Sequence, residues 1–286
     1  MEPNRMAKLR YLYFPGCKIK PFLPEYDHTT RAVLSALDVG LEDIELNCCG
    51  YPVRHVDFTA AMLSGARILA MAARKGLPVL TPCKCCYGNL KHAHFWMHRN
   101  AELRERVNGL LQEDGLRWSG DVVVRHLLTA LAEDLGLAHV QARVKHPLHG
   151  YRVAAHYGCH ALRPGDVTQF DNPLAPTIFE SVIAATGATA VEWPMRLDCC
   201  GYPLWEKNNQ LSLALMQQKL ADARESGAQA LITACTYCQL QFGQVRSEHL
   251  SGTAAYNDLP AVLVSQLLGV ALGLPDVALG QAGLTG

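Results

Sequence analysis

The chain has 286 residues, about twice the length of one typical domain, so two domains or an internal duplication are expected. Apolar residues make up 49% and charged residues 18%, which excludes an intrinsically disordered chain. The 26 basic residues balance the 26 acidic ones, which argues against nucleic acid or an anionic membrane as the main partner.

The first ten residues are polar and basic, with no apolar run of the kind that a signal peptide contains. We therefore expect a cytoplasmic protein. In a reducing cytosol structural disulfides are rare, and the 11 Cys are an odd number. Clustered cysteines in such a chain indicate metal ligation or redox chemistry.

The first half of the chain alternates short apolar runs with helical patterns. An aromatic run before Gly16 and Cys17 predicts a strand that enters a tight turn, and residues 78–81 predict a second strand. A helical pattern covers residues 58–75, with Gly76 at the C-cap. The cysteines of this half stand in three groups: Cys17; Cys48-Cys49-Gly50-Tyr51-Pro52; and Cys83-Lys84-Cys85-Cys86.

The midsection, residues 99–151, contains no cysteine, and a helical pattern runs from Asp121 to Leu135. The second half then repeats the first, with a short run before Gly158, a helical pattern over 210–226 and a strand over 230–233. Its cysteines fall in the same order: Cys159; Cys199-Cys200-Gly201-Tyr202-Pro203; and Cys235-Thr236-Tyr237-Cys238.

The last apolar stretch, residues 261–274, is shorter than the roughly 20 residues of a membrane span. It predicts a packed or docking helix and no membrane span. The alternation of strands and helices predicts an α/β fold of two similar duplicated modules, each a small, mostly parallel sheet with its Cys motifs in the loops after strands. The predicted boundaries are a first module at 1–98, a helical connector at 99–151, a second module at 152–274 and a tail at 275–286.

Ten cysteines belong to the repeat, five in each module, and Cys85 is the remainder. A structural zinc site closes at four ligands, and so does an ordinary cubane cluster held by thiolates. Five thiols therefore favour one polynuclear iron–sulfur cluster per module. Two zinc sites that use four of the five, or buried thiols, are the alternatives.

The repeated Cys-Cys-Gly motif with its downstream Cys-x-x-Cys resembles the cysteine-rich CCG domain, and the two-copy chain resembles the B subunit of heterodisulfide reductase. Further stretches that carry the resemblance are residues 156–164, 171–173, 185–188 and 265–274. The resemblance covers nearly the whole chain. The composition favours the sulfur-oxidising bacterial branch of heterodisulfide-reductase-like proteins.

The resemblance implies a noncubane [4Fe-4S] cluster in each module, with a disulfide or sulfane S–S bond cleaved or formed in a pocket between the two. The ligands that it implies are Cys17, Cys48, Cys49, Cys83 and Cys86 for one cluster, and Cys159, Cys199, Cys200, Cys235 and Cys238 for the other. It also implies two partners in one complex, a ferredoxin-like iron–sulfur protein and an FAD-containing flavoprotein, and a disulfide or sulfur-carrier substrate. Because Gly-x-Gly-x-x-Gly is absent from the chain, electrons are expected to pass through partners.

Three other residues lie beside the proposed ligands. His160 follows Cys159 and is a candidate for the substrate pocket, where it would donate a hydrogen bond to a sulfur. Lys84 and Tyr237 lie inside the two Cys-x-x-Cys motifs; lining the pocket is one role open to them, but we interpret them as ordinary loop residues. Cys85 is either a buried thiol or an additional redox-active one.

Two other functions stay open at this stage. One is an electron-transfer CCG subunit of a succinate, glycolate or lactate type of dehydrogenase. The other is a zinc-binding structural protein.

Overall fold

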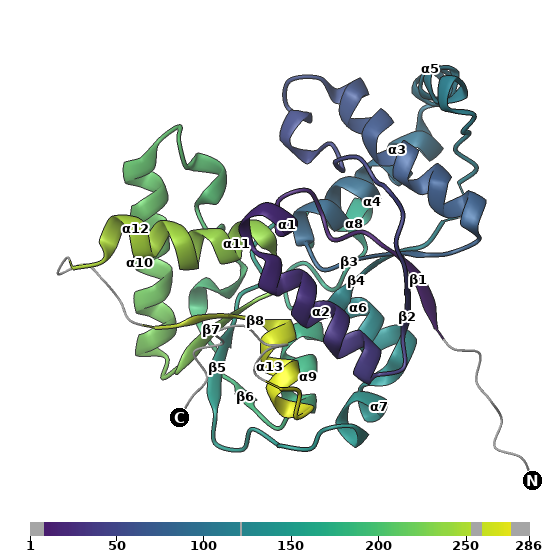
Figure 1. Cartoon of the computed structure of the whole chain (residues 1–286). Coiled ribbons are helices and arrows are strands. Elements are labelled where there is room, and N and C mark those ends of the chain that lie inside the picture. Colours follow the sequence, from purple (N-terminus) through teal and green to yellow (C-terminus); the bar gives the residue numbers. More distant parts are fainter. Residues whose placement is uncertain (1–8, 121, 253–258, 276–286) are drawn as a thin grey trace, which may run out of the picture.

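A computed structural model of the chain describes residues 9–120, 122–252 and 259–275. It contains two four-stranded sheets, with strand orders β2-β1-β3-β4 and β6-β5-β7-β8 (Figure 1). Every pairing in both sheets is parallel. The predicted α/β class and the duplicated modules are confirmed.

The elements from residue 10 to residue 142 are β1 (Arg10–Tyr13), α1 (Ile19–Phe22), α2 (Pro24–Ala36), β2 (Gly40–Glu42), η1 (Tyr51–Val53), α3 (Phe58–Lys75), β3 (Val79–Thr81), α4 (Lys84–Arg99), α5 (Ala101–Leu111), η2 (Gln112–Asp114), β4 (Val124–His126), α6 (Leu127–Thr129), the π-helix η3 (Ala130–Gly136) and α7 (Leu137–Ala142). Those that follow are β5 (Arg152–Ala155), α8 (Gly165–Thr168), α9 (Ile178–Ala185), β6 (Thr189–Ala190), η4 (Pro194–Leu197), η5 (Tyr202–Leu204), α10 (Asn209–Glu225), β7 (Ala230–Thr233), α11 (Thr236–Leu240), the π-helix η6 (Gln241–Val245), α12 (Arg246–Leu250), β8 (Ala261–Leu263) and α13 (Val264–Ala271).

Local sequence explains the long helix of each module. Asp57 caps α3 by accepting a hydrogen bond from the Ala60 N–H, and Asn208 caps α10 in the same way from the Leu211 N–H. Gly76 ends α3 in the left-handed conformation, with φ of 64°. The helix predicted over residues 58–75 is therefore confirmed at both ends.

The glycine of each Cys-Cys-Gly motif is required by close approach as well as by backbone conformation. Gly50 and Gly201 have φ of 90° and 94°, a region that favours glycine. A Cβ atom on Gly50 would lie 2.7 Å from the Ala61 carbonyl oxygen, and one on Gly201 would lie 2.7 Å from that of Ser212. The glycine thus lets the cysteine loop lie against the first turn of α3 or α10.

Two predicted helices begin with strands instead. Within the helical pattern predicted from Asp121 to Leu135, residues 124–126 form β4 and helix begins only at Leu127; Asp121 lies outside the described residues. Likewise, the apolar stretch 261–274 opens with β8 before α13. The β-branched run at 122–124 favours a strand, and an apolar run buried in a parallel sheet has no period that separates it from a buried helix. The tail at 276–286 also lies outside the described residues.

The two modules pack through helices that each lays against the other. The last helix of the second module, α13, lies beside α2 of the first, where Thr29 Oγ1 and Ser265 Oγ are 2.7 Å apart (Figure 1). The equivalent helices make the corresponding contact: α9 of the second module packs against α6 and η3, which follow the last strand of the first sheet. One buried apolar cluster contains residues of both modules, so they share a continuous core. In the described part of the chain, no helix combines the length and apolar character that crossing a membrane needs.

A methyl group at Gly88 tests this packing. Gly88 lies in α4, and a Cβ atom there would be 2.4 Å from the His160 carbonyl oxygen in the other module. We expect Gly88→Ala to lower the free energy of unfolding by about 1–3 kcal/mol, because the backbone of one module must shift. Chemical denaturation monitored by circular dichroism measures the effect.

Gly109→Ala is the matched control, since an added Cβ in this exposed position of α5 meets no atom within 4 Å. Alanine there should raise the stability by up to about 1 kcal/mol through helix propensity. Equal stability changes in the two variants would contradict close packing of α4 on the second module.

Candidate metal centre

The cysteines of the first module meet at the carboxyl ends of its parallel strands. Cys17 follows β1, the pair Cys48 and Cys49 follows β2, and Cys83 follows β3 as the N-cap of α4. Ligands in α/β sheets collect at this edge because the loops after parallel strands converge there. All five sulfur-bearing residues proposed for the first cluster line one cavity.

The second module repeats this arrangement with its own five cysteines. Its cavity is lined by Cys159, Cys199, Cys200, Cys235 and Cys238. Cys85 and His160 line the same cavity, so the remainder cysteine of the first module reaches into the second. The spacing pattern of the sequence thus corresponds to two separate groups of five thiols in space.

Hydrogen bonds between sulfurs distinguish one cysteine of each adjacent pair. Cys17 Sγ and Cys48 Sγ are 3.5 Å apart, and the Gly50 N–H lies 3.5 Å from Cys48 Sγ. The pKa of the Cys48 thiol is lowered strongly, chiefly because Cys17 donates to its sulfur. The pKa of Cys199 is lowered in the same way, chiefly by Cys159. Each loop is therefore built to hold a thiolate, the form that binds metals.

Each Cys-x-x-Cys motif opens a helix. Cys83 is the N-cap of α4 and Cys235 is the N-cap of α11, so Cys86 and Cys238 fall in the first turns. The unpaired N–H groups of a helix N-terminus favour negative charge at these positions. All four of these cysteines are buried.

The two cavities adjoin where these loops meet. Cys83 Sγ lies 4.0 Å from Cys235 Sγ, and Cys85 Sγ lies 3.7 Å from the same atom. These three sulfurs form one group with metal-ligand spacing, and His156, Cys200 and Cys238 form another. His156 Nε2 is 3.3 Å from Cys238 Sγ. Any group held in one cavity therefore lies next to a group held in the other.

His160 occupies the seam between the modules. Its Nδ1 is 3.2 Å from Cys85 Sγ and 3.7 Å from Cys159 Sγ, while Nε2 lies 2.9 Å from the Tyr51 hydroxyl of the first module. Burial lowers the pKa of His160. The structure thus brings the predicted pocket residue to the cysteine cavity, with both ring nitrogens beside polar partners.

Lys84 is not the ordinary loop residue that its place in the sequence suggested. It is 2% exposed, and Nζ donates to the carbonyls of His156 and Tyr157 at 2.9 and 3.0 Å. Burial lowers its pKa to about 8, an effect that the nearby Cys238 and Cys235 thiolates oppose. No local pattern distinguishes a lysine that crosses into another module from one that faces water.

Lys219 is a second buried lysine, and it was not predicted from the sequence. It is fully buried in α10, donates to the Met195 carbonyl and has its pKa lowered to about 8 by burial. The sequence pattern does indicate this burial, because Met216 lies three residues before Lys219 and Ala223 four residues after it, which puts Lys219 on the apolar face of the helix.

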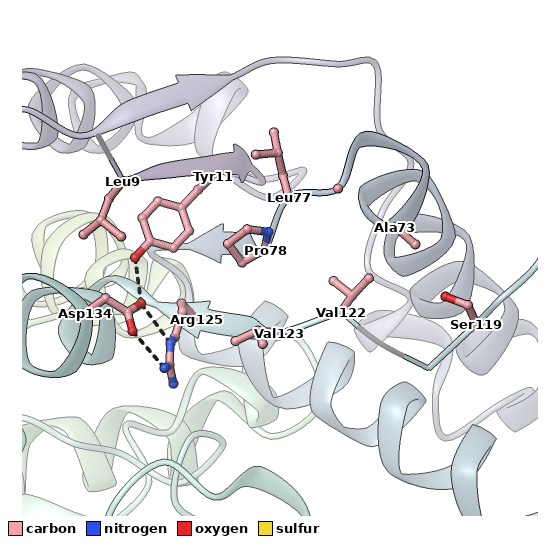
Figure 2. A pocket seen from close by; sticks show the side chains of 11 residues that line it. Leu9, Tyr11, Ala73, Leu77, Pro78, Ser119, Val122, Val123, Arg125 and Asp134 are labelled. Atoms are coloured by element: carbon pink, nitrogen blue, oxygen red, sulfur yellow. Dashed lines mark hydrogen bonds and ion pairs between the residues drawn. The ribbon is translucent and has the colours of Figure 1, made fainter. Parts of the chain in front are cut away.

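A larger cavity lies elsewhere, at the amino ends of strands in the first sheet. Leu9, Pro78 and Val123 line it just before β1, β3 and β4, away from the cysteine edge (Figure 2). On its wall the Tyr11 hydroxyl donates to Asp134 Oδ2 at 2.6 Å, and Arg125 Nε donates to the same oxygen at 2.9 Å (Figure 2). This cavity has no cysteine in its lining, so the candidate metal ligands are those of the two smaller ones.

The donor set of each small cavity fits an iron–sulfur group. Five thiols exceed the four ligands of a structural zinc ion, and soft thiolates are the ligands of iron–sulfur clusters. The adjacent pair in each Cys-Cys-Gly loop suits a polynuclear group, in which neighbouring sulfurs bind different irons.

Comparison with known proteins identifies the repeated module. A family model described as the cysteine-rich domain CCG matches residues 11–91 and again residues 153–243. The chain is 32% identical over 282 residues to the B subunit of the ferredoxin/F420H2-dependent CoB-CoM heterodisulfide reductase of Methanosarcina acetivorans, covering 96% of this chain and 92% of that protein.

Other relatives carry different descriptions. The 8-methylmenaquinol:fumarate reductase membrane anchor subunit of Wolinella succinogenes is 32% identical over 272 residues, which is 94% of each chain. A solved structure described as a hypothetical protein from Helicobacter pylori superposes with a TM-score of 0.75 at 17% identity. It is matched over 96% of this chain and 52% of its own, so this chain spans about half of it, and the likeness shows the fold alone.

Proposed function

Since the chain belongs to the CCG cysteine-rich-domain family, in the two-copy form of the heterodisulfide reductase B subunit, we propose that it is the component of a heterodisulfide-reductase-like complex that handles the S–S bond. It cleaves or forms a disulfide or sulfane bond between two noncubane [4Fe-4S] clusters. The observation that carries the proposal is the meeting of two five-cysteine cavities, with Cys83 and Cys235 sulfurs 4.0 Å apart.

The proposed ligand sets are the cysteines that line each cavity. They are Cys17, Cys48, Cys49, Cys83 and Cys86 in the first module, and Cys159, Cys199, Cys200, Cys235 and Cys238 in the second. Cys85 lines the second cavity without belonging to the repeat, and we propose no ligand role for it.

Two clusters would supply the two electrons that cleavage of a disulfide requires, or accept the two that its formation releases, one on each side of the bond. The chain's own residues prepare the space between them. Tyr51 and Tyr237 line the cavities with ring centroids 5.5 Å apart. His160, held by the Tyr51 hydroxyl, presents Nδ1 to the sulfurs and is placed to hydrogen-bond a substrate sulfur.

The partners follow from the same proposal. A ferredoxin-like iron–sulfur protein and an FAD-containing flavoprotein of the same complex would exchange electrons with this chain, whose sequence lacks the Gly-x-Gly-x-x-Gly dinucleotide fingerprint. The direction we propose is oxidative, in dissimilatory sulfur metabolism, with a sulfane or disulfide carrier as substrate.

The test is iron and acid-labile sulfide analysis of the anaerobically purified full chain. Two clusters predict about eight iron atoms per chain, whereas about four would exclude the two-cluster proposal. A small disulfide or persulfide added to the loaded chain should change its electron paramagnetic resonance spectrum. A colourless chain that contains zinc would instead support a structural zinc protein.

A second function is favoured by one specific observation, the 32% identity to a fumarate reductase membrane anchor subunit. In that case the chain would be an electron-transfer CCG subunit of a dehydrogenase. It would then pass electrons between partners, while its cluster spectra would not respond to any disulfide or persulfide.

A further inference from the structure

His126 lies at the end of β4, where the two modules face each other. It is fully buried, with 0% of its side chain exposed. Its Nδ1 accepts a hydrogen bond from the Leu128 N–H at 3.1 Å. Nε2 lies 2.9 Å from the Pro82 carbonyl oxygen and 3.1 Å from the Ala234 carbonyl oxygen. Because both carbonyls can only accept, Nε2 must carry the hydrogen and is shared between them.

The two carbonyls belong to equivalent places in the two modules. Pro82 immediately precedes Cys83, and Ala234 immediately precedes Cys235. A single N–H group thus binds the backbone one residue before the first cysteine of each Cys-x-x-Cys motif. The two sulfurs that follow these carbonyls are the pair that lies 4.0 Å apart across the seam.

The second module has a different residue at the corresponding place. In the first sheet Thr81 of β3 pairs with His126, and in the second sheet Thr233 of β7 pairs with Leu263. Leu263 is buried in a small apolar cluster with Ile19 and Tyr26 and has no polar side-chain atom. The His126 imidazole of the first module therefore hydrogen-bonds the Cys-x-x-Cys loops of both modules.

A second donor reaches only one of the loops. The Tyr26 hydroxyl, which is also buried, donates to the Pro82 carbonyl oxygen at 2.6 Å. Pro82 therefore keeps a hydrogen-bond donor when the imidazole is removed, but the link between the two loops does not survive. Removing the Tyr26 hydroxyl therefore tests the support of one loop, and removing the His126 imidazole tests the connection between the two loops.

We infer that His126 is a positioning residue that ties the two Cys-x-x-Cys loops together and so sets the separation of the two iron–sulfur sites. This inference rests on the proposed function, because it assigns clusters to both loops. Burial keeps the imidazole neutral and lowers its pKa to about 3, so it remains a single N–H donor throughout the physiological pH range.

Three variants of the full chain test the inference. His126→Leu introduces the residue that the second module uses, and His126→Gln places an amide N–H near the position of Nε2. Tyr26→Phe removes the donor that reaches Pro82 alone. Each is loaded with clusters anaerobically, and iron content and the spin–spin interaction between the clusters are measured by electron paramagnetic resonance.

We expect His126→Leu to keep its iron content, because no proposed ligand changes, but to show an altered interaction between the clusters. His126→Gln should restore the interaction at least in part, and Tyr26→Phe should leave it unchanged. An unaltered interaction in His126→Leu, or an equal loss in His126→Leu and His126→Gln, overturns the inference.

A cluster-free arm separates this inference from the proposed function. Diamide, an azo oxidant, takes two electrons and two protons from a pair of thiols and leaves a disulfide. Oxidation should link Cys235 to Cys85 or Cys83, and peptide mapping measures the rate. We expect about tenfold slower linking in His126→Leu, the factor that corresponds to one buried hydrogen bond.

If the wild-type chain binds fewer than two clusters, the proposed function fails while the linking rates still decide the role of His126. Equal linking rates in the wild type and in His126→Leu would show that the imidazole does not hold the loops together.

Discussion

The Cys49→Ser and Cys200→Ser variants are each expected to lose one cluster and keep the other. Both cysteines are buried, and each lines only one of the two cavities. A serine oxygen is a poor replacement for a thiolate on iron. Iron should fall from about eight to about four atoms per chain, and two-electron S–S reduction should fall below about 1% of the wild-type rate.

Cys85→Ser is the matched control for these two variants. Cys85 is also buried, and its sulfur is 3.7 Å from a proposed ligand, but it stands outside the repeat. Its iron content should stay at the wild-type level. A loss of iron in Cys85→Ser, with retention in Cys83→Ser or Cys86→Ser, would show that the ligand set of the first cluster is wrong.

Spacing in the sequence was sufficient to predict which cysteines lie together, because each Cys motif is placed by the strand just before it. Each Cys group follows a strand, and strands in a parallel sheet deliver their loops to one edge. The helix over residues 58–75 was equally predictable, since Asp57 and Gly76 mark its two ends within the local sequence. Motif and cap are both properties of a few neighbouring residues.

The short strands β4 and β8 were not predictable in the same way. Each has three residues and is followed directly by helical residues. Its pairing with β3 or β7 joins segments far apart in the chain, and an apolar run of that length has no period of its own. The strands are defined by the sheet that they complete.

His126 and Lys84 were missed for a related reason. Each acts through contacts with a segment more than 40 residues away, and each reaches the opposite module. A histidine after a strand and a lysine in a Cys-x-x-Cys loop have many ordinary roles. Their function follows only from the packing of one module on the other.

The pseudo-equivalent positions reveal an electrostatic difference between the modules. Lys84 corresponds to Thr236, as the residue after the first cysteine of the Cys-x-x-Cys motif. Lys219 corresponds to Ile68, counted from the N-caps Asn208 and Asp57 of their helices. The thiolates that act on both lysines belong to the second module. Two buried lysines therefore lie near the cysteines of the second module, whereas Lys18, which lines the first cavity, is only partly buried.

This difference predicts unequal reduction potentials. A nearby positive charge stabilises the reduced, more negative form of a cluster, so the second cluster should have the higher potential. Lys84→Thr and Lys219→Ile introduce the residues of the first module. Each should lower the potential of the second cluster by about 50–100 mV, the effect of one poorly screened charge.

Single-cluster backgrounds assign the shift to one site. In the Cys49→Ser background only the second cluster remains, and a redox titration should show the full decrease for both lysine variants. In the Cys200→Ser background only the first cluster remains, and the same substitutions should change its potential much less. Lys207→Thr, at an exposed position of the second module, is the control for loss of a solvated charge. Equal shifts in the two backgrounds would mean that the buried lysines do not distinguish the clusters, and the two halves of the S–S bond would then meet electrostatically equivalent sites.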